Sequence, residues 1–191
     1  LADLEDMFRE YKVELVVEDR RFDGTDLDVE FRGTLTPLQK RAAADLRAHE
    51  QGVLVAPPGT GKTVVGIALI ASRARNTLVL VHRRPLLEQW ITQLAVFLGL
   101  QPEEIGRIGA GMNKPTGRLD VAMLQSLVKG EAVADLVATY GHVVVDECHH
   151  VPAVSFERVM REVKARFVTG LTATPQRRDG HHPILEMQLG P

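Results

Sequence analysis

Residues 52–63 read Gly-Val-Leu-Val-Ala-Pro-Pro-Gly-Thr-Gly-Lys-Thr, an apolar run followed by a glycine-rich turn that ends in Lys-Thr. This order predicts a strand, a tight turn and a helix, which is typical of a nucleoside triphosphate site. Glycines let successive backbone N–H groups point at phosphate oxygens, and the helix start adds its positive dipole end. The P-loop pattern begins with Gly, whereas this chain has Ala56 there. An ordinary glycine turn is the alternative, which the strand–turn–helix context disfavours.

Two side chains of this turn have chemical roles in the P-loop pattern. Lys62 is expected to reach the β and γ phosphates, and to help catalysis by neutralising their charge. The Thr63 hydroxyl is expected to bind Mg²⁺. The residues of the turn predicted to contact the nucleotide are Pro58, Gly59, Thr60, Gly61, Lys62 and Thr63.

A second motif, which contains two adjacent acids, lies at residues 143–150, which read Val-Val-Val-Asp-Glu-Cys-His-His. Three valines suit a strand buried on both faces of a parallel sheet, and such a strand places its next residues at the ligand-binding edge. There Asp146 is predicted to hold Mg²⁺ through its water shell, and Glu147 to orient and deprotonate the attacking water. A pair of solvated acids at a strand end is the alternative, which the preceding valines and the P-loop disfavour.

The ordered motifs of the chain resemble those of the first RecA-like motor domain of superfamily 2 helicases and translocases of the DExH type. The similarity is closest to the branch with XPB-like repair helicases and type I and III restriction translocases, and it covers about residues 34–180. Besides the P-loop, the matching segments are Asp146-Glu147-Cys148-His149, Leu171-Thr172-Ala173-Thr174-Pro175, the run 81–90, the run 121–127 and Leu35-Thr36-Pro37-Leu38-Gln39. Six ordered motifs are specific together, although each short one is weak alone.

The resemblance implies ATP and Mg²⁺ as cofactors, nucleic acid as partner, and a second RecA-like domain in the full-length chain that supplies a catalytic arginine. It also implies that His149, Thr172 and Thr174 couple the ATP site to nucleic acid, although the threonines could be plain strand-end hydroxyls. Gln39 is implied to read adenine. It also lies three residues after Thr36, which is the spacing of a helix capping box, and the two roles can overlap.

The expected nucleic-acid contacts follow two predicted strands. Arg83 and Arg84 lie between a strand end and a helix start, where side chains and backbone N–H groups can bind a phosphate together. Gln125 and Ser126 follow the next strand in the same way. A solvated basic pair is the alternative for the arginines. Since no pattern suggests reading of base edges, we expect binding through the nucleic-acid backbone. We also expect DNA in preference to RNA as the partner.

Several further residues have less specific interpretations. We do not expect zinc at Cys148, His149 and His150, because adjacent side chains on an extended segment point to opposite sides and the chain has no second cysteine. Trp90 lies on the apolar face of a predicted helix, so we expect it in the core and not as a base-stacking platform. Lys114 and Arg118 are weaker candidates for nucleic-acid contact.

Composition excludes some classes of protein without identifying one. A length of 191 residues, with 45% hydrophobic and 25% charged residues, fits one globular domain. The net charge of −2 argues against a histone-like basic binder. A single cysteine excludes an internal disulfide, and no apolar run approaches a membrane span, so we expect a cytoplasmic, nucleoid-associated or nuclear protein. A chain that begins with Leu and ends at Pro191 is expected to be part of a longer protein.

The alternation of predicted strands and helices indicates an α/β fold of the RecA-like P-loop type, with a mostly parallel central sheet covered by helices on both faces. We expect an N-terminal extension over residues 1–33, with short strands at 12–17 and 28–32, and the RecA-like domain over 34–191. Its predicted strands are 53–56, 77–81, 120–124, 142–146 and 166–169, its predicted helices are 36–49, 62–73, 85–98 and 156–164, and 109–117 is expected to be a loop.

The sequence therefore predicts the ATP-binding domain of a nucleic-acid-dependent ATPase, helicase or translocase. Two alternatives come from other classes: a P-loop NTPase of another kind, and a nucleotide-switched nucleic-acid-binding module without unwinding activity. The Thr-Ala-Thr segment argues against the first. The presence of Lys62, Thr63, Asp146 and Glu147 argues against the second.

Overall fold

The computed structural model describes residues 16, 18–130, 132–147 and 153–173. The helices are α2 (Pro37–Arg47), α3 (Lys62–Arg73), α4 (Arg84–Leu98), α5 (Leu124–Leu127) and α6 (Ala153–Glu162), with short 3-10 turns η1 (Pro102–Glu104) and η2 (Asp135–Thr139). The strands are β1 (Gln51–Val55), β2 (Thr77–Val81), β3 (Gly106–Gly109), β4 (Met112–Lys114), β5 (Leu119–Met123), β6 (Val128–Lys129), β7 (Ala132–Val133), β8 (His142–Asp146) and β9 (Phe167–Thr172).

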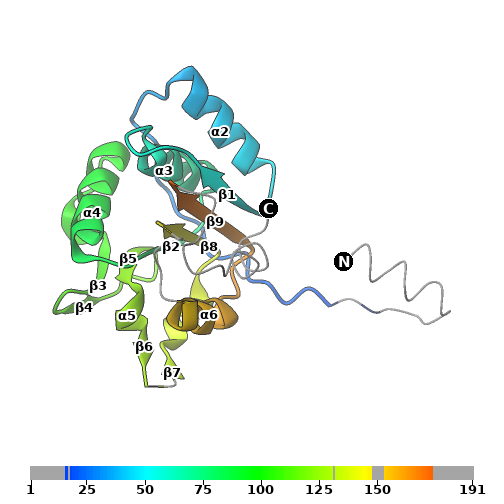
Figure 1. Ribbon diagram of the computed structural model, residues 1–191, viewed down its shortest axis with the longest axis vertical. Coiled ribbons are helices and arrows are strands. Elements are labelled where there is room, and N and C mark those ends of the chain that lie inside the picture. Colours follow the sequence, from blue (N-terminus) through cyan, green and yellow to red (C-terminus); the bar gives the residue numbers. More distant parts are fainter. Residues whose placement is uncertain (1–15, 17, 131, 148–152, 174–191) are drawn as a thin grey trace.

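Seven of these strands form one sheet in the order β1-β9-β8-β2-β5-β3-β4. Every neighbouring pair is parallel except β3 and β4, which pair antiparallel at one edge. Strands β6 and β7 make a separate small hairpin. Parallel strands need long crossover connections, and the helices between them supply these connections. The predicted α/β architecture with a mostly parallel sheet is therefore confirmed (Figure 1).

Side chains alternate along each strand, so both faces of the sheet present apolar side chains, and helices cover both of them. In β2, Val79 and Val81 pack with the buried side chains of α3 and α4, whereas Leu78 and Leu80 pack with those of α5 and α6. Strands buried on both faces read as continuous apolar runs, as Val143–Val145 does in β8. The sheet itself thus separates the two cores, and Figure 1 shows helices on both of its faces.

Helix α2 forms an additional layer outside α3. Its Leu46 packs with Val65 and Leu69 of α3 in a small separate cluster. The helix begins with Pro37, and Thr36 caps it, because the Thr36 side chain accepts from the Gln39 backbone N–H. This start lies beside the P-loop, which matters for the site described below.

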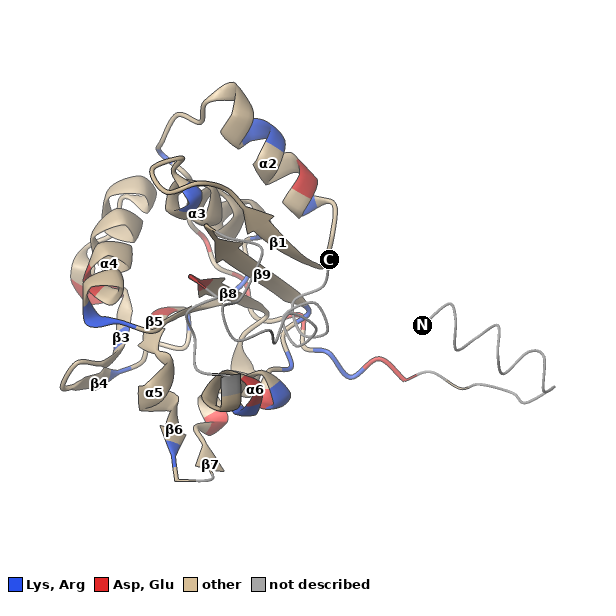
Figure 2. Ribbon diagram, in the orientation of Figure 1, with Lys and Arg blue, Asp and Glu red and all other residues tan. Residues whose placement is uncertain are grey.

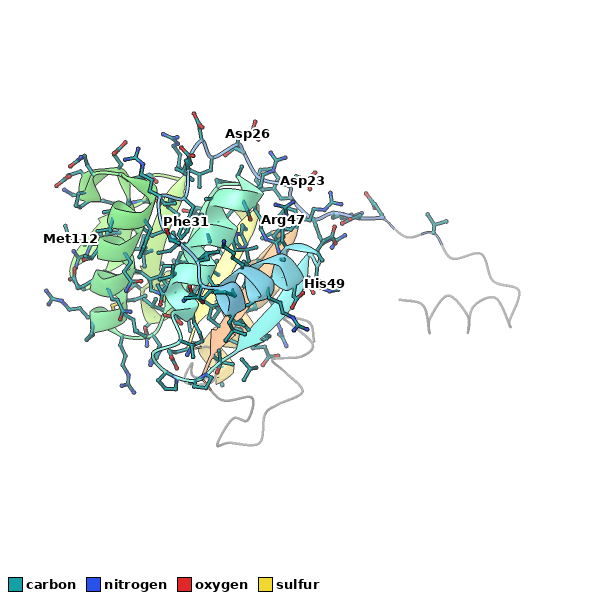
Figure 3. The ribbon with its side chains drawn as sticks, turned by 90° about the horizontal axis from the view of Figure 1, so that it is seen from above. Asp23, Asp26, Phe31, Arg47, His49 and Met112 are labelled. Carbon is teal, nitrogen blue, oxygen red and sulfur yellow. The ribbon has the colours of Figure 1, made fainter. Side chains whose placement is uncertain are left out.

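The N-terminal extension differs from the prediction. Residues 28–32 form no strand; the described part of this segment makes only isolated bridges, from Phe22 to Ala165 and from Asp26 to Arg75. Its backbone bonds go instead to helix ends, as in Leu27 N–H to Ala74 O (3.0 Å) and Arg32 N–H to Phe97 O (2.7 Å). These partners provide hydrogen bonds for backbone N–H groups of the segment without a neighbouring strand. Figure 3 labels Asp23, Asp26 and Phe31 along this course.

The remaining differences concern short elements. The expected loop 109–117 contains β4, which folds back on β3. Strands β3, β6 and β7 were not predicted, since each has four residues or fewer. The predicted strand 12–17 lies almost entirely outside the described residues, and the boundary at residue 33 stays a prediction. Among the described residues, no helix is both long and apolar enough to cross a membrane.

Buried polar side chains fasten the amino end of the sheet. The Asn76 amide donates to Gly117 O (3.0 Å) and Thr139 O (2.8 Å), and its oxygen accepts from the backbone N–H groups of Thr25 and Gly141 (both 3.0 Å). One side chain thereby joins the N-terminal segment to two loops. His142 lies nearby, with its Nε2 3.1 Å from Thr169 Oγ1. Burial, and then the positive charge of Arg73, hold the pKa of His142 well below its usual value.

We expect His142 to make the stability of the domain fall in mild acid. The folded state resists protonation of this ring, whereas the unfolded chain binds a proton below about pH 6.5. The unfolded state therefore gains protons as the pH falls, and stability decreases by up to about 1.4 kcal/mol per pH unit. Urea unfolding between about pH 7.5 and 5.5 measures this slope.

A His142→Gln variant is the control, because its amide can keep the hydrogen bond to Thr169 but does not titrate. Its unfolding free energy should vary less over the same pH range. Equal slopes in the two proteins would contradict the assignment of the effect to His142.

Candidate functional site

A pocket of about 330 Å³ opens where the P-loop faces the end of β8. It is lined by Pro58, Gly59, Gly61, Lys62, Thr63, Val64, Leu86, Gln89, Gln93, Asp146 and Glu147. The P-loop lysine and the two acids, more than eighty positions apart in the sequence, thus meet in one cavity. In Figure 2 the tip of β8 is red, and this strand ends at Asp146.

The order and register of three strands bring these groups together. Strand β9 lies between β1 and β8, with Val55 opposite Thr172 and Asp146 opposite Leu171. The backbone N–H of Ala56, at the start of the P-loop, donates to Thr172 O at 3.0 Å. All three strands are parallel, so their carboxyl ends form one edge, which is where open α/β sheets bind ligands.

A larger groove of about 1030 Å³ lies elsewhere, between the N-terminal segment, α2 and α3. Alanines and a few long side chains such as Lys40 and Arg47 line it, and it contains none of the residues expected at the nucleotide. The smaller pocket therefore remains the candidate site, because the chemistry-bearing residues converge there.

The P-loop has the conformation expected of a phosphate-binding turn. Gly59 and Gly61 both have φ near +81°, a left-handed conformation that favours glycine. Lys62 is the first residue of α3, and the residue is 9% exposed. The Lys62 ammonium donates to Ala56 O (2.8 Å) and Pro57 O (3.3 Å). These carbonyls hold the ammonium inside the loop, where a phosphate oxygen could replace them as its partner.

Gln39 connects the start of α2 to the P-loop. Its Oε1 accepts from the Thr36 N–H (3.0 Å), which completes a capping box, and its Nε2 donates to Thr60 O (2.9 Å). A Cβ added at Gly61 would lie 2.4 Å from Gln39 Nε2, so a side chain there would displace the Gln39 amide, and the φ of +81° itself favours glycine. The capping role is thus confirmed, and contact with adenine stays a prediction.

Asp146 is the most constrained residue of the pocket. It is 4% exposed, and each carboxylate oxygen accepts one hydrogen bond: Oδ2 from Trp90 Nε1–H (2.7 Å) and Oδ1 from the Glu147 backbone N–H (2.9 Å). Burial raises the pKa of Asp146, while the Trp90 bond acts in the opposite direction. Glu147 itself has φ of +52°, so the chain turns sharply at the second acid.

The residues of this pocket fit a bound Mg²⁺. Mg²⁺ prefers a few protein oxygen ligands together with phosphates and water, and it does not need an all-protein cage. The Asp146 carboxylate and Thr63 both face the same cavity. Among the described residues, no group of three or more His, Cys, Asp or Glu could hold a metal ion.

Only one of the three predicted coupling residues lies among the described residues. Thr172 is buried at the end of β9, beside the start of the P-loop. His149 and Thr174 lie outside the described residues, as do Cys148 and His150. Their positions relative to the pocket therefore stay predictions.

The predicted nucleic-acid contacts gather at the ends of β2 and β5, which are neighbours in the sheet. Arg83 is the N-cap residue of α4 and Arg84 is its first residue; both are exposed. Figure 2 shows the start of α4 in blue. Gln125 and Ser126 are exposed in α5. The Gln125 amide donates to His82 O (3.0 Å), so it also ties α5 to the β2–α4 turn. The structure brings these four residues into adjacent turns, and their contact with nucleic acid stays a prediction.

Sequence analysis missed what α4 contributes to the pocket. Leu86, Gln89 and Gln93 line it, and the Gln93 Oε1 atom is buried with no hydrogen-bond partner among the described residues. Trp90 was correctly predicted to be buried, but its bond to Asp146 was not foreseen. Helical spacing places positions 86, 89, 90 and 93 on one face, which is the signal that could have indicated a shared role.

Comparison with known proteins agrees with this geometry. Residues 32–177 match the family described as "Type III restriction enzyme, res subunit". The chain is 30% identical over 189 residues to the putative helicase 109L of Invertebrate iridescent virus 3, covering 96% of this chain and 55% of that protein. It is 34% identical over 158 residues to the putative DNA 3'-5' helicase Rad25 of Halobacterium salinarum, covering 82% of this chain and 26% of that protein.

A solved structure shows the same fold. The UvsW helicase of bacteriophage T4 superposes with a TM-score of 0.71 at 13% sequence identity, covering 99% of this chain and 75% of that one. The chain spans about half of the viral relative and about a quarter of the archaeal one. The match over residues 32–177 shows that this chain belongs to the type III restriction enzyme Res-subunit family, and the helicase relatives and the common fold identify it as the first RecA-like domain of a superfamily 2 protein.

Proposed function

We propose that the protein carrying this domain hydrolyses ATP with Mg²⁺ and couples the hydrolysis to movement on nucleic acid. The observation that carries the proposal is the pocket in which Lys62, Thr63, Asp146 and Glu147 converge. Phosphoryl transfer requires little covalent chemistry from a protein, and depends on positioning and on charge stabilisation around the γ-phosphate. These four side chains are the types that such a site needs.

Each residue has a separate task in this proposal. Lys62 exchanges its two backbone carbonyl partners for phosphate oxygens and neutralises their charge. Thr63 and Asp146 hold Mg²⁺, which neutralises phosphate charge when it is bound. Glu147 orients the attacking water and accepts its proton. The P-loop N–H groups and the start of α3 supply the remaining positive potential.

Nucleic acid as the partner is supported by the exposed basic turn before α4. Arg83 and Arg84 stand at the start of a 15-residue helix, where side chains and backbone N–H groups can grip one phosphate together. Gln125 and Ser126 offer a second position in the adjacent turn. The archaeal relative is named a DNA helicase, which favours DNA as the track.

The test is ATPase activity measured with and without DNA or RNA oligonucleotides, and no stimulation by either would contradict the proposal.

Two substitutions should separate binding from turnover. Lys62→Ala should abolish tight ATP binding, because the main cation of the pocket is lost. Glu147→Gln should keep binding but slow hydrolysis by about 10²–10⁴-fold, since the amide cannot accept the proton from water. Equilibrium binding of an ATP analogue and steady-state phosphate release measure the two effects. If Glu147→Gln hydrolysed ATP at the wild-type rate, Glu147 would not be the base.

Gln39 should act on ATP affinity through the P-loop as well as through any contact with the base. In Gln39→Glu, one carboxylate oxygen can still complete the capping box, but the other cannot donate to Thr60 O. We expect faster hydrogen exchange of P-loop amides, unchanged protection of α2, and an affinity for ATP lowered by about tenfold, the loss of roughly one hydrogen bond.

Gln39→Ala is the comparison variant, because it removes the cap and the P-loop bond together. It should also loosen the first turn of α2. Unchanged exchange of the P-loop amides in Gln39→Glu would contradict the role of the Thr60 bond.

The isolated 191-residue chain should hydrolyse ATP poorly. Among the described residues that line the pocket, Lys62 is the only cation, and none is an arginine. An arginine at the γ-phosphate contributes about 10³–10⁵-fold to such reactions. Phosphate release by residues 1–191, compared with the complete protein under the same nucleic-acid conditions, measures the deficit. Equal turnover by the two proteins would show that no second domain is needed.

A further inference from the structure

The indole of Trp90 lies between the P-loop helix and the acidic strand end. Trp90 is 0% exposed and stands on α4, while its Nε1–H donates to Asp146 Oδ2 at 2.7 Å in a buried hydrogen bond. A buried indole N–H needs a partner, and a carboxylate is a strong one because the bond is charge-assisted. Apolar packing accounts for the burial of the indole rings. It does not account for the direction of the N–H, which points at the carboxylate of Asp146.

The Asp146 carboxylate is oriented by two hydrogen bonds, one from the Trp90 indole and one from the backbone. The Glu147 backbone N–H donates to Oδ1 at 2.9 Å. With one donor on each oxygen, rotation about the bond to the carboxylate would break both contacts. The lone pairs that remain are therefore held in a fixed direction relative to the pocket.

Close packing fixes the indole itself. A Cβ added at Gly66, in α3, would lie 3.0 Å from Trp90 Cη2 and 3.1 Å from Leu171 Cδ1. Glycine inside a helix is unfavourable relative to alanine, so this position is explained by the close approach of the ring. The ring consequently has little room to tilt, and its N–H is preorganised toward Asp146.

We propose that Trp90 is a positioning residue that orients the Asp146 carboxylate toward Mg²⁺·ATP. The inference rests on the proposed function, because it assumes that Asp146 holds the metal. Groups that donate hydrogen bonds to a metal-holding carboxylate fix its direction, and their loss typically lowers metal affinity about 10–100-fold. Trp90 does not touch the reacting atoms; it acts through Asp146.

The test is Trp90→Phe in the complete protein that carries this domain. Phenylalanine keeps an aromatic ring at the position and removes the N–H donor. We expect the Mg²⁺ concentration for half-maximal ATPase activity to rise by about 10–100-fold. Binding of Mn²⁺, followed by electron paramagnetic resonance with a non-hydrolysable ATP analogue, should weaken by a similar factor. Affinity for the same analogue in EDTA should be unchanged, a separation that general damage to the pocket would not produce.

Tyr140→Phe is the matched control. Tyr140 is fully buried, and its hydroxyl donates to the carboxylate of Asp120. Asp120 pairs with the amino-terminal half of β2, at the opposite end of the sheet from Asp146. The control therefore also removes one buried donor from one buried carboxylate. We expect it to lower the unfolding free energy without changing the dependence on Mg²⁺ or Mn²⁺.

A second replacement removes the donor with almost no change in shape. β-(3-Benzothienyl)alanine keeps both fused rings and has sulfur where indole has N–H. Placed at position 90, it should weaken Mn²⁺ binding as Trp90→Phe does, and it decides the question if Trp90→Phe proves unfolded by circular dichroism. Unaltered Mn²⁺ binding with this isostere would overturn the proposal.

The result also separates this inference from the proposed function. If the wild-type protein neither binds Mn²⁺ with nucleotide nor hydrolyses ATP, the proposed function itself is wrong. If the wild type does both and the isostere variant matches it, only the role of Trp90 is wrong.

Discussion

The site depends on the parallel alignment of β1, β9 and β8. Strand β1 leads into the P-loop, β9 ends at Thr172 and β8 ends at Asp146. Hydrogen bonding in register places these three strand ends on one edge of the sheet. The bond from Ala56 N–H to Thr172 O extends this pairing one residue past β1, so the P-loop leaves the sheet directly beside Thr172. A slip of one residue would turn the side chains of a strand to the opposite face.

The two ends of the sheet use buried polar groups in different ways. At the amino end, Asn76 has a partner for every polar atom of its amide, and Asp120 accepts from the Thr116 and Gly117 backbone N–H groups. These networks fasten loops to the sheet. At the carboxyl end, Asp146 has two donors but also lines a pocket, and the Lys62 ammonium donates to the loop carbonyls of Ala56 and Pro57. Groups at that end can therefore exchange their partners for a ligand.

Helix α4 is the element that connects the two candidate binding regions. Its exposed start carries Arg83 and Arg84, and its buried face carries Trp90 against Asp146. Because a helix is stiff over two turns, the orientation of the acidic strand end and that of the basic turn are set by the same rigid body. The packing of Trp90 on Gly66 brings α3, and with it the P-loop, into the same arrangement.

The sequence by itself determined the local elements: the P-loop strand, turn and helix, the valine strand with its two acids, and the alternation that requires a parallel sheet. Those features depend on neighbouring residues, whose pattern of apolar and glycine positions is visible in the chain. The prediction failed for residues 28–32, where a long-range bond from Arg32 N–H to Phe97 O replaces strand pairing. It also failed for 109–117, where β4 pairs with β3 in a short local hairpin. Only the tertiary structure decided that Trp90 donates to Asp146 and that Gln39 reaches Thr60, because both contacts join residues distant in sequence whose side chains meet only after the helices pack on the sheet.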